Sequence, residues 1–260
     1  MSGPSERGVE IQGTTCRVWE KGEGAPIGFL AGLGGLLSWT PFLDELAKSR
    51  RVIVPSLPGF PGGGRGHDGL YSHLDWLLAT RDLLLGAGLD GADLVGVSAG
   101  GSLAAEMAAI WPDSVPRLVL ISPLGIYDEA DPVTDVWAQV PGTQGALYVE
   151  DQTKLEAVVA MPEGEDETEW QILTIRANEA AAQIFWPLSD TGLAQRLGRI
   201  GQPTLVLWGE ADKVIAPSYA ERVAGAIGPS ATIRRLAGAG HLAEIDAPEA
   251  VAAAVLAHCD

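Results

Sequence analysis

The stretch Ala92-Asp93-Leu94-Val95-Gly96-Val97-Ser98-Ala99-Gly100-Gly101 joins a short apolar run to a helical pattern through a glycine-rich turn. The apolar run over 92–97 predicts a buried strand. The helix expected over 99–111 stops before Pro112, because the residue before a proline disfavours helical backbone. Gly96 to Gly100 therefore form a G-x-S-x-G motif between a strand and a helix, which is the context that a nucleophile elbow requires.

Ser98 is the candidate nucleophile at this turn. A serine in a strained backbone conformation needs neighbours without side chains, and Gly96 and Gly100 meet that need. The turn also puts the hydroxyl at the N-terminus of a helix, whose dipole and free N–H groups favour an anionic intermediate. A plain glycine-rich turn is the alternative, so the interpretation depends on a base and an acid elsewhere in the chain.

A serine hydroxyl is a poor nucleophile until a base takes its proton. The chain has four histidines, of which His73 and His258 lie in expected helices and His67 in a glycine-rich loop. His241 differs, because it lies in a glycine-rich loop after the last expected strand and before the last expected helix. That placement suits a base at the carboxyl edge of a sheet, so His241 is the candidate base.

The acid that orients the histidine is expected between the nucleophile and the histidine in sequence. Asp212 lies there, directly beyond the strongly apolar run at 203–208, and is the favoured candidate. Glu210 in the same loop and Asp128 after the preceding strand are its competitors. Each of them could equally be an ordinary loop carboxylate bonded to its own backbone.

An oxyanion hole needs two backbone N–H donors aimed at one point. Ala99, directly after Ser98, is the first candidate. Leu33, in the glycine-rich segment after an early strand, is the second, with Gly34 as the fallback and as a candidate substrate contact. The same glycines could belong to a phosphate-binding loop, but the G-x-G-x-x-G spacing and a following Lys-Ser or Lys-Thr pair are both absent from the sequence.

Short runs of valine, leucine and isoleucine alternate with longer helical patterns along the chain. This alternation predicts an α/β fold, with a mostly parallel central sheet and helices on both faces. A hairpin is expected over 9–20, turning near Gly13. The further strands are expected near 26–31, 51–54, 92–97, 117–122, 203–208 and 231–236, and the helices near 41–49, 72–86, 99–111, 217–227 and 247–258.

The alternation lapses between 124 and 197, where the sequence becomes acidic and rich in aromatic residues. Connections of this length are usually functional lids. We therefore expect an inserted cap at 124–197 on a core made of 1–123 and 198–260. Trp137 and Trp186 are candidate substrate contacts of the cap, although such aromatics could instead only pack the cap against the sheet.

The composition excludes several function classes. With 34 acidic against 17 basic residues, the formal net charge of −17 is repelled by phosphate backbones and anionic lipids, so we expect neither a nucleic-acid nor a membrane partner. Cys16 and Cys259 show no disulfide framework and no metal-ligand spacing, so we expect no metal. Charges throughout the first 24 residues leave no apolar signal-peptide core, which favours a cytoplasmic location.

The chain resembles the α/β-hydrolase superfamily over almost its whole length, through the elbow and the segments 205–212, 240–242 and 248–251. It is similar to capped serine hydrolases, namely carboxylesterases and the meta-cleavage C–C bond hydrolases of aromatic ring-cleavage pathways. The resemblance implies a lid over the site, a Ser98, Asp212 and His241 triad, and no cofactor. Ala31 and Ser56 stand where the family usually has a histidine and an aspartate, but neither change removes a triad member.

These observations predict a serine hydrolase that acts on a small to medium ester or acyl substrate through an acyl-enzyme intermediate. The substrate is expected to be a small molecule with an apolar or aromatic acyl group, because the expected cap is rich in aromatic residues. Two alternatives stay open. One is hydrolysis of a C–C bond in a diketone of the ring-cleavage type, and the other is a protein of this fold without hydrolytic activity, such as a lyase, a cofactor-free oxygenase or a ligand receptor.

Overall fold

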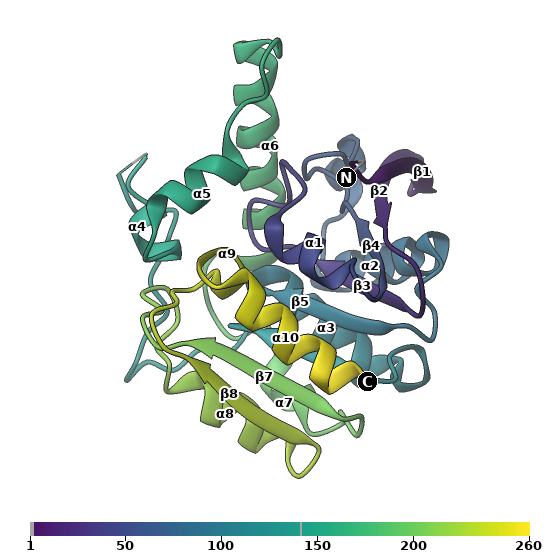
Figure 1. The fold of residues 1–260 in the computed structure, drawn as a ribbon. Helices are drawn as coiled ribbons and strands as arrows, with labels where there is room; N and C mark the ends of the chain where they lie inside the picture. The colour runs from purple at the N-terminus through teal and green to yellow at the C-terminus, as the bar shows by residue number, and fades with distance from the viewer. Residues whose placement is uncertain (1–2, 141) are drawn as a thin grey trace.

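The structure, a computed structural model, describes residues 3–140 and 142–260; residues 1 and 2 of the expected core and residue 141 of the expected cap lie outside them. Eight strands form one sheet in the order β1-β2-β4-β3-β5-β6-β7-β8 (Figure 1). The strands are β1 (Ser5–Ile11), β2 (Thr14–Lys21), β3 (Pro26–Leu30), β4 (Arg51–Pro55), β5 (Asp93–Val97), β6 (Leu118–Ile121), β7 (Thr204–Gly209) and β8 (Ala231–Leu236).

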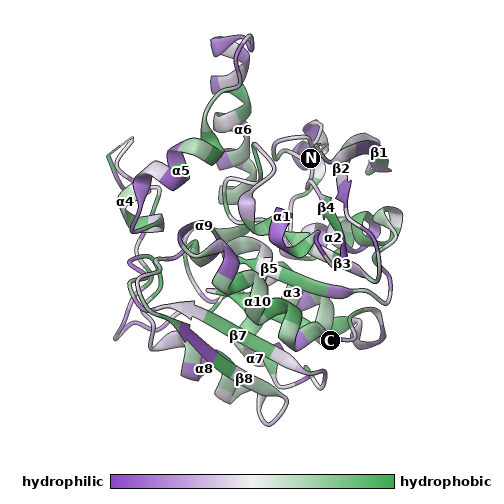
Figure 2. Ribbon diagram, viewed as in Figure 1, coloured by the Kyte–Doolittle hydropathy of each residue, from purple (hydrophilic) through white to green (hydrophobic). Residues whose placement is uncertain are grey.

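The sheet is mostly parallel, as the sequence predicts. β1 and β2 form an antiparallel hairpin that turns at Gln12 and Gly13, and β2 runs antiparallel to β4. The six strands from β4 to β8 pair in parallel. Every residue of β5 is buried, since a central parallel strand is covered on both faces, and Figure 2 shows this strand as mainly hydrophobic.

Helices follow most strands, as the predicted alternation requires. They are α1 (Pro41–Leu46), α2 (His73–Ala87), α3 (Ser98–Ile110), α4 (Gly145–Tyr148), α5 (Gln152–Val159), α6 (Glu167–Phe185), α7 (Leu193–Leu197), α8 (Tyr219–Ile227), α9 (Ala243–Asp246) and α10 (Pro248–Cys259), with the short 3-10 helices η1 (Arg65–Gly69) and η2 (Pro112–Ser114). None of the helices within the described residues combines the length and the apolar composition that crossing a membrane requires.

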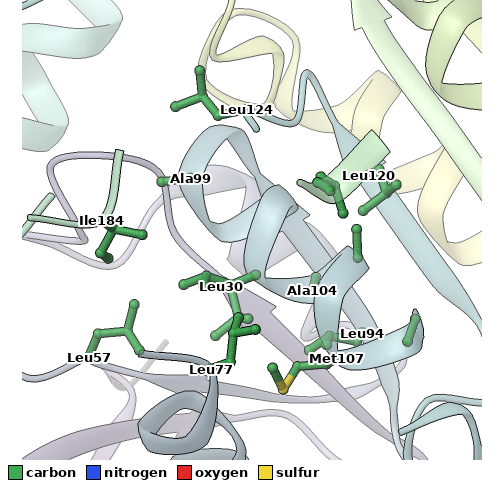
Figure 3. Close-up of a cluster of buried hydrophobic side chains, with 14 of the residues drawn as sticks. Leu30, Leu57, Leu77, Leu94, Ala99, Ala104, Met107, Leu120, Leu124 and Ile184 are labelled. Carbon is green, nitrogen blue, oxygen red and sulfur yellow. The ribbon is translucent and has the colours of Figure 1, made fainter. Parts of the chain in front are cut away.

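Two hydrophobic cores cover the two faces of the sheet. One holds side chains of α2, α3, α7 and α8, and Figure 3 shows Ala104 and Met107 of α3 beside Leu94 of β5 and Leu77 of α2. The other core holds side chains of α1, α9 and α10, with Phe42 against Phe29 of β3. Burial of apolar surface on both faces holds the sheet rigid, and the strand ends are therefore fixed positions for functional groups.

The long connection between β6 and β7 contains α4, α5, α6 and α7. α4, α5 and α6 lie beyond the carboxyl ends of the parallel strands, and the outer part of α6 projects from the body of the molecule (Figure 1). α7 differs from them, because Leu193 and Leu197 belong to the core cluster on the α3 face. The division into a core and a cap at 124–197 stays a prediction.

Candidate active site

Ser98 lies at the junction of β5 and α3 with a backbone φ of +52°, in the left-handed region that non-glycine residues seldom adopt. A Cβ atom on Gly96 would overlap the carbonyl oxygen of Gly100, and one on Gly100 would overlap the carbonyl oxygen of Leu30. Glycine is therefore the residue that this close approach of strand, turn and helix allows. This strained backbone points the Ser98 hydroxyl toward the loop that carries His241.

Ser98, His241 and Asp212 form one hydrogen-bonded line, although they are far apart in sequence. His241 Nε2 lies 2.8 Å from Ser98 Oγ, and His241 Nδ1 lies 2.9 Å from Asp212 Oδ2. With its proton on Nδ1, the imidazole donates to Asp212 and accepts the hydrogen bond of the serine hydroxyl. All three residues are buried, so water competes little for these bonds.

Asp212 is held as an anion by its surroundings. Burial by itself would raise the pKa of its carboxyl, but attraction to His241, the His241 hydrogen bond and two backbone N–H donors outweigh burial and lower the pKa. The two donors are the N–H groups of Val214 and Ile215, each 2.9 Å from Asp212 Oδ1. An ionised Asp212 suits the stabilisation of a transient imidazolium at His241.

The structure does not bring the two competing carboxylates into this line. Asp128 pairs with Arg222, and its backbone N–H donates to the Tyr219 hydroxyl at 2.9 Å. Glu210 is exposed, and its backbone N–H donates to Leu236 at 3.0 Å. Both are therefore loop carboxylates of the ordinary kind.

The loops that carry Asp212 and His241 pack backbone against backbone. A Cβ atom on Gly209 would overlap the carbonyl oxygens of Gly240 and Ala239, and the Ala211 N–H donates to Ala239 at 2.9 Å. β7 and β8 lie side by side, so their following loops leave the same edge of the sheet. This contact sets the spacing between the carboxylate and the imidazole.

A cavity of about 490 Å³ opens beside Ser98. Leu33 and Gly34, the two candidates after β3, both line it, while Ala99 is buried directly after Ser98. A Cβ atom on Gly32 would lie 3.4 Å from the Ser98 Cβ, so the segment after β3 runs directly past the serine. The connection between β6 and β7 lines another side of the cavity with residues of α4, α5 and α6, including Tyr148, Leu155, Val158, Trp170, Thr174 and Ala177.

The two tryptophans expected to contact the substrate lie away from the lining of this cavity, and their contact with a substrate stays a prediction. Trp137 packs against the hydrophobic core, and Trp186 is 61% exposed just after α6. Neither is among the residues that line the cavity. Trp137 lies in a turn before α4 and Trp186 directly follows α6, so where the two side chains lie depends on how these connections pack, which an aromatic composition does not predict.

Tyr148, Trp170 and Glu244 line the cavity and were not among the residues singled out for substrate contact. Burial raises the pKa of Tyr148 to about 12, and its ring centre lies 6.3 Å from that of His241. Burial also raises the pKa of Glu244 to about 8, with the nearby Asp246 charge adding to the effect against an opposing backbone hydrogen bond. Its position three residues after His241 is the one sequence signal that could have drawn attention to it.

Asp246 is a further residue that the sequence did not single out. Its carboxylate accepts hydrogen bonds from the N–H groups of Gly240 at 2.7 Å, Glu150 at 3.0 Å and Asp151 at 3.0 Å. The neighbouring Leu242 N–H donates to the Tyr148 carbonyl at 2.8 Å. These bonds tie the histidine loop to the segment between α4 and α5.

Residues 29–254 match the alpha/beta hydrolase family. The chain belongs to this family. The match runs from the end of β3 to α10 and so includes the elbow and the loops of both proposed partners of Ser98. The α/β-hydrolase chain thus has the fold that its sequence predicts.

Two proteins with sequences similar to this α/β-hydrolase are named for different reactions. A 2-hydroxy-6-oxo-2,4-heptadienoate hydrolase of Pseudomonas putida strain F1 is 28% identical over 86% of this chain and 85% of that protein. A monoacylglycerol lipase of Xenopus laevis is 26% identical over 81% of this chain and 67% of that protein. Among solved structures, a meta-cleavage product hydrolase of Pseudomonas fluorescens IP01 covers 97% of this chain and 96% of its own, with 20% identity and a TM-score of 0.77. That likeness shows the fold alone.

Proposed function

We propose that the chain is a serine hydrolase in which Ser98 is the nucleophile, His241 the general base and Asp212 the residue that orients His241. The single observation that carries this proposal is the hydrogen-bonded line from Ser98 through His241 to Asp212, at 2.8 and 2.9 Å. Such a line lets an imidazole take the serine proton while the buried carboxylate stabilises the resulting charge.

In the proposed reaction, Ser98 Oγ attacks a carbonyl carbon as its proton moves to His241 Nε2. The tetrahedral intermediate collapses, the leaving alkoxide takes that proton, and Ser98 is left acylated. A water molecule then gives a proton to His241 and attacks the acyl carbon, and the acid leaves as the proton returns to Ser98 Oγ. The backbone N–H groups of Ala99 and Leu33 are the proposed donors to the oxyanion, because the segment after β3 runs past Ser98.

We further propose a neutral substrate with an apolar acyl group, in a cavity covered by a cap at 124–197. The residues that line the cavity are mostly apolar, and within the described part of the chain no lysine or arginine is among them. A substrate carboxylate would therefore give up its hydration shell on binding without gaining a cationic partner, and this desolvation costs free energy. Glu244 does not offset this, since a carboxyl group with a pKa of about 8 offers no positive charge.

C–C bond hydrolysis is the second candidate, and the similarity to the P. putida hydrolase favours it. That relative is named for a dienoate, which is a carboxylate anion. The absence of a lysine or arginine among the described lining residues supports the ester more than the dienoate. Both reactions would use the same serine, histidine and aspartate.

The test of the mechanism is Ser98→Ala measured on an activated aryl ester. Loss of the nucleophile should lower kcat by at least about 10³-fold, while the far-UV CD spectrum and Tm stay close to those of the wild type. Ser102→Ala is the matched control, since Ser102 lies one turn further along α3, is buried, and its hydroxyl has no hydrogen-bond partner among the described residues. Near wild-type turnover by Ser98→Ala would refute the proposal.

The substrate class is tested with two aryl esters of equal acyl length, a hexanoate and a mono-adipate, which differ by a terminal carboxylate. We expect kcat/KM to be at least about 10-fold higher for the hexanoate, because an unpaired carboxylate is costly to bury. A 2-hydroxy-6-oxo-dienoate is assayed beside them. A kcat/KM for the dienoate above both esters would favour the C–C hydrolase instead.

A further inference from the structure

We propose that His67, Asp68 and Glu179 form a binding site for a divalent transition-metal ion of the zinc type, which joins η1 to α6. Within residues 3–140 and 142–260, these three residues are the one His, Cys, Asp and Glu group whose ligand atoms all lie within 4.8 Å of one another. The site is separate from the Ser98 cavity, and the proposal does not depend on the proposed hydrolysis.

The three ligand atoms lie within 4.8 Å of one another. His67 Nε2 lies 3.4 Å from Asp68 Oδ1 and 3.9 Å from Glu179 Oε2. Ligands of a tetrahedral zinc ion, each about 2.0–2.2 Å from the metal, lie about 3.3–3.6 Å apart, so small side-chain movements would suffice. The other oxygen of Asp68 faces Arg65, whose Nε lies 3.4 Å away, and Oδ1 stays directed toward the imidazole.

The imidazole of His67 supplies the independent observation. Its side chain is fully buried, yet neither Nδ1 nor Nε2 has a hydrogen-bond partner among the described residues. A Cβ atom on Gly59 would lie 2.6 Å from the His67 ring, so the glycine is what allows the ring to pack against this loop. Burying a polar group without a partner is costly, and a metal ion on Nε2 would give one of the two ring nitrogens a partner.

The ligand types select the class of metal. One imidazole nitrogen and two carboxylate oxygens suit zinc and its first-row neighbours, whereas magnesium and calcium prefer oxygen ligands alone. Asp68 and Glu179 are about half exposed, at 53% and 57% for their side chains, so an ion and a fourth, water ligand could enter from solvent. His67 Nε2 itself is covered, so these two carboxylate side chains would have to move aside for an ion to reach it.

The proposed ion would strengthen an existing contact between the cap helix and the core. Arg176, one turn before Glu179, donates to the carbonyls of Gly59 at 3.2 Å and Gly63 at 3.3 Å. Ala177 and Asn178 on the same turns of α6 line the Ser98 cavity. An ion between η1 and Glu179 would thus hold in place the part of α6 that forms a wall of the cavity.

The test is a zinc titration of the EDTA-treated, dialysed full chain, followed by differential scanning calorimetry and isothermal titration calorimetry. At a zinc concentration about 100 times Kd, we expect Tm to rise by about 5 to 10 °C. Glu179→Gln should lower the zinc affinity at least about 10-fold, and at the same zinc concentration it should therefore lose about half of that rise or more. Glu169→Gln, the same change at another exposed position of α6, is the matched control and should respond as the wild type does.

Two results of the zinc titration would overturn the proposal. One is the absence of a zinc-dependent Tm shift in the wild type, and the other is an equal shift in the wild type, Glu179→Gln and Glu169→Gln, which would indicate nonspecific binding to an acidic surface. Magnesium at the same concentration should leave Tm unchanged. A magnesium response equal to that of zinc would contradict the assignment to a transition metal.

Discussion

At the scale of single residues, the elbow depends on backbone groups that lie too close together for side chains. Ser98 keeps a φ of +52°, and the two glycines around it pack directly against the backbone of α3 and β3. The strain of a left-handed serine costs of order 1–3 kcal/mol and persists only because the surrounding structure determines it. The glycines are therefore as necessary to the turn as the serine is to the proposed chemistry.

Gly96→Ala should destabilise the protein by about 2 to 4 kcal/mol, because the new Cβ atom would overlap the Gly100 carbonyl and force strand and helix apart. Denaturant unfolding measures the loss. Gly225→Ala in α8 is the matched control, because no atom lies within 4 Å of the new Cβ; there the better helix propensity of alanine should stabilise by up to about 1 kcal/mol. Equal effects of the two changes would contradict the steric explanation.

A second residue-scale feature is the buried carboxyl of Glu244. Its pKa of about 8 lies above the ordinary value of 4.5, so between these values the folded state binds a proton that the unfolded state has released. The contribution of this group to stability is therefore fully present below pH 4.5 and declines as pH rises toward 8.

Glu244→Gln removes this titration. The free energy of unfolding of the variant, relative to the wild type, should therefore increase with pH between about 4.5 and 8, with a slope of at most about 1.4 kcal/mol per pH unit. Denaturant unfolding of both proteins at several pH values gives the slope, and the difference measured at pH 4.5 is the baseline. A difference that stays constant over this range would show that Glu244 ionises normally in the folded state.

At the scale of elements, the histidine loop is attached to the insertion between β6 and β7. The Asp246 carboxylate in α9 accepts hydrogen bonds from three backbone N–H groups. These belong to Gly240 in the histidine loop and to Glu150 and Asp151 before α5. Lys154 of α5 adds a bond from Nζ to the Asp246 carbonyl at 2.6 Å. A movement of α5 would therefore shift the loop that positions His241.

Asp246→Asn should lower kcat by about 10 to 100-fold, because an amide group cannot accept all three N–H bonds and the histidine loop would shift. Loss of the buried acceptor should also lower the stability by about 1 to 3 kcal/mol. Glu249→Gln, an exposed change at the start of α10, is the control and should leave kcat within about 2-fold. Unchanged kcat in Asp246→Asn would mean that His241 is positioned by its other contacts.

At the scale of the whole molecule, two hydrophobic cores hold a rigid sheet inside a strongly acidic surface. The formal net charge of −17 surrounds a cavity whose described lining residues include no lysine or arginine. The field of the whole protein therefore acts against anionic substrates before they reach the site. Salt weakens this long-range repulsion, while the cost of burying the charge in the cavity is little affected.

Ionic strength should therefore affect the two matched aryl esters differently. Raising NaCl from about 20 to about 200 mM should increase kcat/KM for the mono-adipate by about 2 to 5-fold and leave that for the hexanoate nearly unchanged. Initial rates at low substrate concentration measure both values. A similar response of the two esters would show that the net charge has no part in substrate discrimination.

The sequence by itself determined the fold class, the approximate positions of most strands and core helices, and the candidates Ser98, Asp212 and His241. These were readable because a strand-turn-helix motif, hydrophobic periodicity and chain order are local or sequential properties. Their catalytic roles and the cap boundaries stay predictions. The sequence placed the start of the hairpin at residue 9, whereas β1 begins at Ser5, and it did not predict α7 and α9.

Only the tertiary structure decided which carboxylate reaches the imidazole, and that Tyr148, Trp170 and Glu244 line the cavity while Trp137 and Trp186 do not. The same holds for the meeting of His67 with Glu179, which are separated by more than a hundred residues. The physical reason is that the packing of the helices and turns between β6 and β7 sets which of their side chains face the cavity, and contacts across such distances in the chain leave no periodic signal in the sequence.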